Sequence, residues 1–123
     1  PVPCEGAKIQ QVLLNILRNG SQAMQEVGTK NPIFIVKTRF DAHRKMACVE
    51  IKDNGPGMDN LTLNRVFEPF FTTKPVGVGT GLGLSVSYFI ITENHGGEMS
   101  VESTLGFGTN FIIHLPLERK QPR

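Results

Sequence analysis

The chain lacks the hallmarks of several protein classes. Its formal net charge is only +2 over 123 residues, which is too small to indicate a nucleic acid or membrane-surface partner. No apolar run approaches the roughly 20 residues that span a bilayer, and no signal peptide opens the chain. Cys4 and Cys48 stand alone without metal-ligand spacing, so we interpret them as reduced thiols of a cytoplasmic protein. We expect neither nucleic acid nor direct membrane contact.

Length and composition favour one soluble globular domain over residues 1–123, with 39% hydrophobic and 20% charged residues. The abrupt start at Pro1 and the basic tail 119–123 indicate cut ends. We therefore expect a fragment of a larger protein.

Residues 5–27 show the apolar recurrence of an amphipathic helix, which Gly28 would end. Asn15 and Asn19 are four residues apart, so they lie one turn above each other at the edge of the apolar stripe. They could cap polar neighbours or face water. Alternatively, their amide oxygens could face a cation such as Mg²⁺ or a polar ligand.

The remaining pattern predicts strands at 33–40 and 46–51 joined by a polar turn, a short helix at 61–66, a helix at 84–94, and strands at 98–102 and 109–115. This order predicts an α+β fold: a two-layer α/β sandwich, with a mixed, mostly antiparallel sheet and helices on one face.

A turn, 53–58 (DNGPGM), follows the second strand. Its two glycines leave little bulk beyond the Asp53 carboxylate, so a planar ligand could press against backbone while Asp53 accepts a hydrogen bond from an exocyclic amine. The alternative is an ordinary strand-to-helix turn in which Asp53 or Asn54 caps the helix.

In the stretch 77–83 every second residue is glycine, directly before the helix at 84–94. Such a run supplies mobility and bare N–H groups at a helix N-terminus, which suits a flap that closes on phosphates. A glycine-rich surface loop is the alternative. The sequence contains neither G-x-x-x-x-G-K-[ST] nor a G-x-G-x-x-G after a strand, so a nucleotide site here is of another kind.

Together these segments resemble the ATP-binding catalytic domain of sensor histidine kinases, in the superfamily of type II topoisomerases, mismatch-repair ATPases and heat-shock chaperone ATPases. The family has five short sequence motifs, called boxes. They are matched in order, over nearly the whole chain, by residues 12–19 (VLLNILRN), 53–58 (DNGPGM), 67–74 (FEPFFTTK), 79–85 (GTGLGLS) and 106–111 (GFGTNF).

The resemblance implies a Bergerat-type fold and a role for each matched residue. Asp53 would bond the adenine amino group, helped by Thr109 through a water, and Asn19 would be the main Mg²⁺ ligand, with Asn15 beside it facing the phosphates. Gly55 and Gly57 would clear space for adenine next to Met58. The lid over the triphosphate would comprise Thr72, Thr73, Lys74, Gly79, Thr80, Gly81, Leu82, Gly83 and Leu84. Asn15 and Lys74 are the candidate catalytic residues.

One position separates kinases from ATPases in this superfamily. Hydrolysing members carry a glutamate one turn before the magnesium asparagine, where it activates water. Here that residue is Asn15, and an amide cannot act as a general base. The resemblance therefore implies phosphoryl transfer rather than efficient hydrolysis.

Two positions depart from the family pattern. Gly20 stands where alanine is usual, which should weaken the helix locally. Ala23 stands where many members stack an aromatic residue on the base. We therefore expect only modest ATP affinity.

The resemblance also implies partners. The acceptor histidine would lie on a separate dimerisation domain of the same protein, and the phosphoryl group would pass to a response regulator receiver domain. We expect the isolated domain to be a monomer and its parent a homodimer. None of His43 (in a turn), His95 (at a helix end) and His114 (in a strand) is expected to be phosphorylated. The rival functions are an anti-sigma-type serine kinase, which the complete box at 67–74 disfavours, and a nucleotide-sensing module, which Ala23 favours.

Overall fold

The computed structural model describes residues 6–71 and 83–116. The elements of these residues follow in the order α1 (Gly6–Glu26), β1 (Phe34–Asp41), β2 (Met46–Asp53), α2 (Asn60–Arg65), α3 (Gly83–Phe89), η1 (Ile90–Asn94), β3 (Glu98–Thr104) and β4 (Gly108–Pro116).

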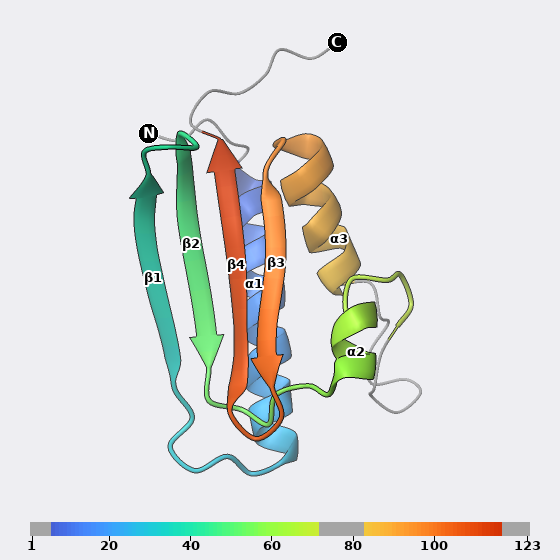
Figure 1. The fold of residues 1–123 in the computed structure, drawn as a ribbon. Coiled ribbons are helices and arrows are strands. Elements are labelled where there is room, and N and C mark those ends of the chain that lie inside the picture. The colour runs from blue at the N-terminus through green and yellow to red at the C-terminus, as the bar shows by residue number, and fades with distance from the viewer. Residues whose placement is uncertain (1–5, 72–82, 117–123) are drawn as a thin grey trace.

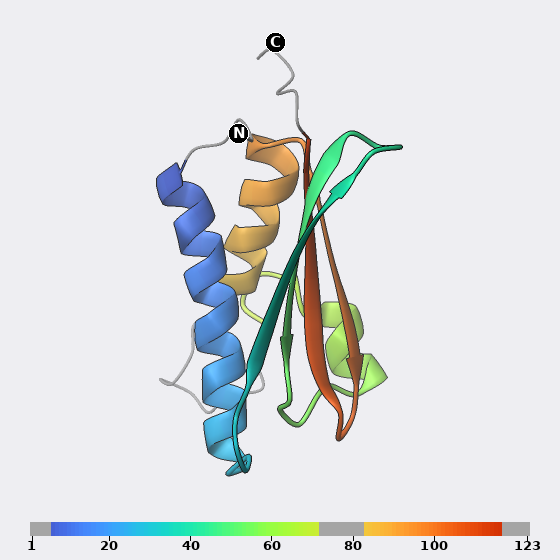
Figure 2. The same ribbon diagram turned by 90° about the vertical axis from the view of Figure 1, so that its left-hand side faces the viewer.

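The strands form one sheet in the order β1-β2-β4-β3, and its three pairings are all antiparallel. Helices α1 and α3 lie side by side on one face of this sheet, and α2 lies beyond the β3 edge (Figures 1 and 2). The predicted two-layer α+β architecture is confirmed, with an antiparallel rather than a mixed sheet in the described residues.

The core lies between α1, the helix pair α3–η1 and the inner face of the sheet. Helix α1 buries Val12, Ile16, Gly20 and Met24, which recur at the four-residue spacing of one helix face. Strand β4 contributes Phe111, Ile113 and Leu115 to the same cluster. Their alternation along β4 follows the period of two that places every second side chain on one face.

Strand β1 departs from the usual burial of a sheet strand. Val36 and Phe40 are 58% and 61% exposed, although Val36 pairs with the core residue Ile51. The reason is visible in Figure 1, where α1 lies behind the other strands and β1 stands out at the edge. Apolar alternation predicted this strand correctly, but it could not show that Val36 and Phe40, unlike Phe34, stay exposed on the inner face of β1.

The helix expected at 84–94 divides into two parts. It begins at Gly83 as α3 and continues from Ile90 as the π-helical turn η1. His95 ends it as the C-cap, and its Nδ1 lies 2.8 Å from the carbonyl oxygen of Ile90. The expectation that His95 ends the helix is confirmed. The described helices include none that is long and apolar enough to cross a membrane.

Candidate functional site

Asp53 is the last residue of β2, and its carboxylate is buried at 8% exposure. Its Oδ1 accepts two backbone hydrogen bonds, from Gly55 N at 2.9 Å and from Thr109 N at 3.3 Å. Among the described residues, nothing donates to Oδ2. The arrangement fixes one carboxylate oxygen and leaves the other for a ligand donor.

The turn after Asp53 is held against the β3–β4 hairpin. Gly106 N donates to Pro56 O at 2.6 Å, and Met58 N donates to Ser103 Oγ at 2.8 Å. The Ser103 hydroxyl in turn donates to Gly108 O and lies 2.9 Å from Thr109 Oγ1. The site residues Asp53, Met58 and Thr109 are therefore linked through one hydrogen-bonded network.

Ser103 was missed by the sequence reasoning. It faces Thr109 across the hairpin, so the turn at 105–107 and a count of residues on either side could have located it. Nothing in its local pattern distinguishes it from other serines in strands.

The glycines of this turn have reasons within the protein. A Cβ on Gly57 would overlap the carbonyl oxygen of Thr104, and Gly57 has a φ of +71°, which favours glycine. A Cβ on Gly55 would come within 3.0 Å of both Asp53 Oδ1 and Met24 Cγ. That these glycines also clear space for adenine remains a prediction.

Asn54 and Asp59 test the alternative interpretation of the turn, in which Asp53 or Asn54 caps the following helix. Helix α2 is capped by Asp59, whose side chain accepts from Thr62 N at 2.8 Å, and this bond lowers the Asp59 pKa. Asn54 instead accepts from Ile33 N and donates to Asn31 O, which holds the loop before β1. The idea that Asp53 or Asn54 caps the helix is therefore wrong.

Asn15 joins α1 to the start of α3. Its Nδ2 donates to Gly83 O at 3.2 Å and to Ser87 Oγ at 3.1 Å, and Ser87 also donates to Gly83 O. Ser87 is fully buried and was not singled out from the sequence. Because the amide nitrogen is used in this way, the Asn15 oxygen is the atom left to face a ligand.

Asn15 and Asn19 are both partly buried on α1. No described residue is hydrogen-bonded to the Asn19 side chain or to the Asn15 oxygen. Within residues 6–71 and 83–116, no group of three His, Cys, Asp or Glu side chains forms a metal cluster. A donor set of two amide oxygens fits Mg²⁺ only when phosphate oxygens or water complete the coordination.

The lid residues fall largely outside the described part of the chain. These are Thr72, Thr73, Lys74, Gly79, Thr80, Gly81 and Leu82. Two lid residues are described: Gly83 begins α3 beside Asn15, and Leu84 packs against the core. Their role in a lid stays a prediction.

Phe67 anchors the segment that leads into the lid. Its ring stacks on Tyr88 at a centroid distance of 4.8 Å and meets Phe111 edge-on at 6.3 Å. A pocket of about 430 Å³ on this side is lined by Phe67, Pro69, Ser85, Val86, Tyr88, Phe89, Thr92 and Glu93. None of these residues is among those predicted to bind ATP.

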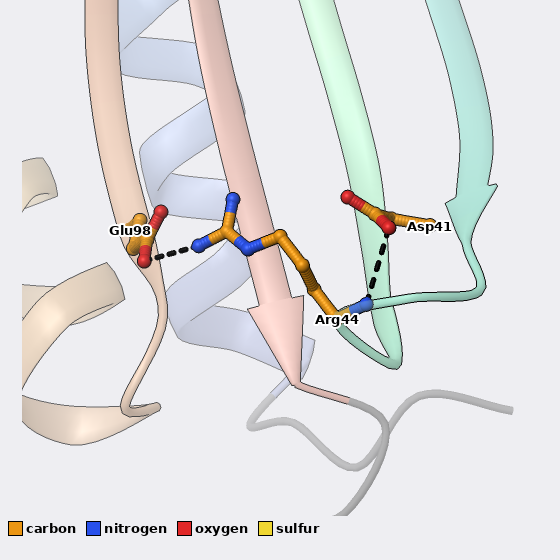
Figure 3. A network of polar contacts seen from close by, with 3 residues as sticks. All are labelled: Asp41, Arg44 and Glu98. Atoms are coloured by element: carbon orange, nitrogen blue, oxygen red, sulfur yellow. Dashed lines mark hydrogen bonds and ion pairs between the residues drawn. The ribbon is translucent and has the colours of Figure 1, made fainter.

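An ion pair between residues far apart in the sequence, Arg44 and Glu98, lies at the opposite end of β2 from Asp53. Arg44, in the β1–β2 turn, reaches across β4 to Glu98 on β3, and its backbone N–H donates to Asp41 (Figure 3). The guanidinium lowers the pKa of Glu98. Nearby, burial raises the pKa of the Cys48 thiol. Both partners of the ion pair are exposed, so the pair contributes little to stability.

Comparison with known proteins agrees with this geometry. Residues 4–119 match the family model described as "Histidine kinase-, DNA gyrase B-, and HSP90-like ATPase". Sporulation kinase E of Bacillus subtilis is 44% identical over 97% of this chain and 15% of its own length. The signal transduction histidine-protein kinase AtoS of Escherichia coli is 38% identical over 95% of this chain and 18% of its own length.

Solved structures give the same result. The catalytic domain of histidine kinase ThkA superimposes with a TM-score of 0.78 and 31% identity, over 94% of this chain and 71% of that one. The mycobacterial sensor histidine kinase MprB superimposes with a TM-score of 0.79 and 25% identity, over 97% of this chain and 78% of that one.

The chain belongs to the family of histidine kinase-, DNA gyrase B- and HSP90-like ATPases. Within that family its relatives and structural neighbours group it with the catalytic domains of histidine kinases. Membership of an ATPase family implies that it binds ATP. The chain spans less than a fifth of the length of these two curated relatives.

Proposed function

We propose that this chain binds Mg²⁺–ATP with its adenine at Asp53 and donates the γ-phosphoryl group to a histidine on a separate dimerisation domain. The observation that carries the proposal is the Asp53 carboxylate. It is buried and held through Oδ1 by two backbone donors, while Oδ2 has no donor among the described residues. The 6-amino group of adenine is a donor of the required kind.

Asn15 and Asn19 would face the phosphate end of the nucleotide. Asn15 is fixed by its two bonds at the start of α3, so its oxygen can stay oriented towards a cation without reorganisation. When bound, Mg²⁺ would neutralise phosphate charge and orient the γ-phosphoryl group. Asn15 cannot remove a proton from water, which favours transfer over hydrolysis.

The lid residues 72–74 and 79–84 would complete the site over the triphosphate. Lys74 is suited to phosphate because its ammonium is a compact charge on a flexible stem. Together with the backbone N–H groups at the start of α3, it would position the γ-phosphoryl group for in-line attack.

The acceptor histidine must come from outside the described residues. His95 is buried and bonded to Ile90 O, and His114 lies within β4. His43 is exposed in the β1–β2 turn, as expected, but it lies at the opposite end of β2 from Asp53. We infer one catalytic domain of a larger cytoplasmic or membrane-anchored homodimer, which passes the phosphoryl group on to a response regulator.

The test is transfer of radiolabel from γ-labelled ATP to an added histidine-bearing dimerisation domain. An acid-labile phosphate on that domain, absent when its histidine is changed to alanine, is the expected result. An acid-stable phosphoserine would favour the serine-kinase function instead. ATP binding without transfer to any added histidine domain would favour a nucleotide-sensing module.

A further inference from the structure

Glycine at position 20 needs a reason, because glycine inside a helix is unfavourable relative to alanine. Gly20 lies in the interior of α1 and is one of the residues on the buried face of that helix. Its φ is not in the left-handed region, so the backbone does not require glycine there. The requirement must come from what surrounds it.

The surroundings are two site-forming side chains. A Cβ on Gly20 would lie 2.8 Å from Cε1 and 3.0 Å from Cζ of Phe34, and 3.0 Å from Oδ2 of Asp53. Phe34 is the cross-strand partner of Asp53, so both side chains stand on the same face of the sheet. The ring edge of Phe34 and the free oxygen of Asp53 thus converge on the space that a larger residue 20 would occupy.

We propose that Gly20 and Phe34 form a size-matched pair that positions Oδ2 of Asp53 and thereby sets the preference for the 6-amino group of adenine. The proposal rests on the proposed function, since it assigns Oδ2 to that amino group. The Phe34 ring and Oδ2 of Asp53 share the space beside position 20, and the absent side chain there leaves room for both. Both residues would act through Asp53, so both are positioning residues.

The test is a double-substitution cycle that compares two nucleotides. Gly20→Ala, Phe34→Leu and the double variant are titrated with ATP and with purine riboside triphosphate, which is ATP without its 6-amino group. The readout is the ratio of the two affinities. A general structural defect would weaken both ligands equally and leave this ratio unchanged.

Each single substitution is expected to lower the ATP preference by about threefold or more, because Gly20→Ala crowds Oδ2 and Phe34→Leu empties part of the space that the ring and Oδ2 share. The double variant should recover the preference to within about twofold of the original, because the methyl group replaces the ring edge. Gly6→Ala is the matched control: it lies in the same helix, and a Cβ there meets nothing within 4 Å.

Thermal unfolding of each variant shows whether it is folded. If Gly20→Ala does not fold, the other two variants still test the pair. A Phe34→Leu variant that loses the ATP preference and a folded double variant that keeps it would support the proposal. Losses that add up in the double variant, or single variants with an unchanged preference, would overturn it. Failure of the unmodified chain to bind ATP, or to prefer it over the analogue, would instead overturn the proposed function.

Discussion

At the residue scale, Asp53 uses its two carboxylate oxygens differently. Oδ1 is bonded to the backbone of the turn and of β4, and Oδ2 is the oxygen that we propose accepts from the adenine amino group. Asp53→Asn can keep the first acceptor, but it places an amide donor or a neutral oxygen where the adenine amine needs a charged acceptor. ATP affinity should fall by roughly 100-fold or more.

The thermal midpoint of Asp53→Asn should stay near that of the unmodified chain, because Oδ1 can still accept both backbone bonds. Calorimetric titration and thermal unfolding measure the two quantities. A near-normal ATP affinity in a folded Asp53→Asn variant would rule out Asp53 as the adenine anchor.

Ser87 offers a second test at this scale. Ser87→Ala removes the hydroxyl that joins Asn15 to Gly83 O, and it should lower the free energy of unfolding by about 1 kcal/mol. Urea denaturation gives this quantity. Ser21→Ala, at an exposed position of α1, is the control and should not destabilise the domain. An unaffected Ser87→Ala variant would show that this link is not stabilising.

At the scale of elements, the β3–β4 hairpin and the turn after β2 meet without room for side chains. A Cβ on Gly108 would overlap the carbonyl group of Asp53, whereas one on Gly106 meets nothing within 4 Å, and both residues have positive φ. Gly106→Ala should cost about 1–2 kcal/mol of unfolding free energy, the price of the left-handed conformation.

Gly108→Ala should cost more than about 4 kcal/mol, because backbone atoms cannot move aside as a flexible side chain can. The comparison is made by chemical denaturation, and for a variant too unstable to isolate by its yield of folded protein. Equal losses at the two positions would mean that the close approach of β4 to Asp53 does not matter.

Periodicity predicted the elements to within about two residues, because α1 and β4 each present one apolar face to a single core. It did not predict the π-helical turn at Ile90–Asn94. That turn depends on how the helix ends, where His95 Nδ1 contacts Ile90 O and Gly97 N donates to Ile91 O. Asp53 could be found because its strand and turn are local features. Ser87 could not be found, because its partner Asn15 is 72 residues away, and Phe34 could not, because its neighbours Gly20 and Asp53 lie on other elements. Ser103 could be placed opposite Thr109 by counting out from the turn, but its bond to Met58, 45 residues away, could not be foreseen.

At the scale of the whole molecule, the ion pair between Arg44 and Glu98 joins the β1–β2 turn to the edge strand β3 (Figure 3). The pKa of Glu98 is lowered in the folded state. Its contribution is therefore present above its unfolded-state pKa of about 4.5 and is lost as the pH falls through the folded-state pKa.

Glu98→Gln should lower the thermal midpoint slightly at pH 7, because an exposed ion pair is screened by solvent, and the difference should vanish in acid. Thermal unfolding across pH measures it. Glu102→Gln, on the same strand and exposed, is the control. A difference that persists below the folded-state pKa would show that the ion pair is not its source.

The central claim is that this chain binds Mg²⁺–ATP for transfer rather than for hydrolysis, and it concerns the whole site at once. The most direct measurement is calorimetric titration of ATP with and without Mg²⁺, together with an assay for released phosphate. Saturable, Mg²⁺-dependent binding with no phosphate release is the expected result. Rapid phosphate release would contradict the role assigned to Asn15 and would group the chain with the hydrolysing members of its family.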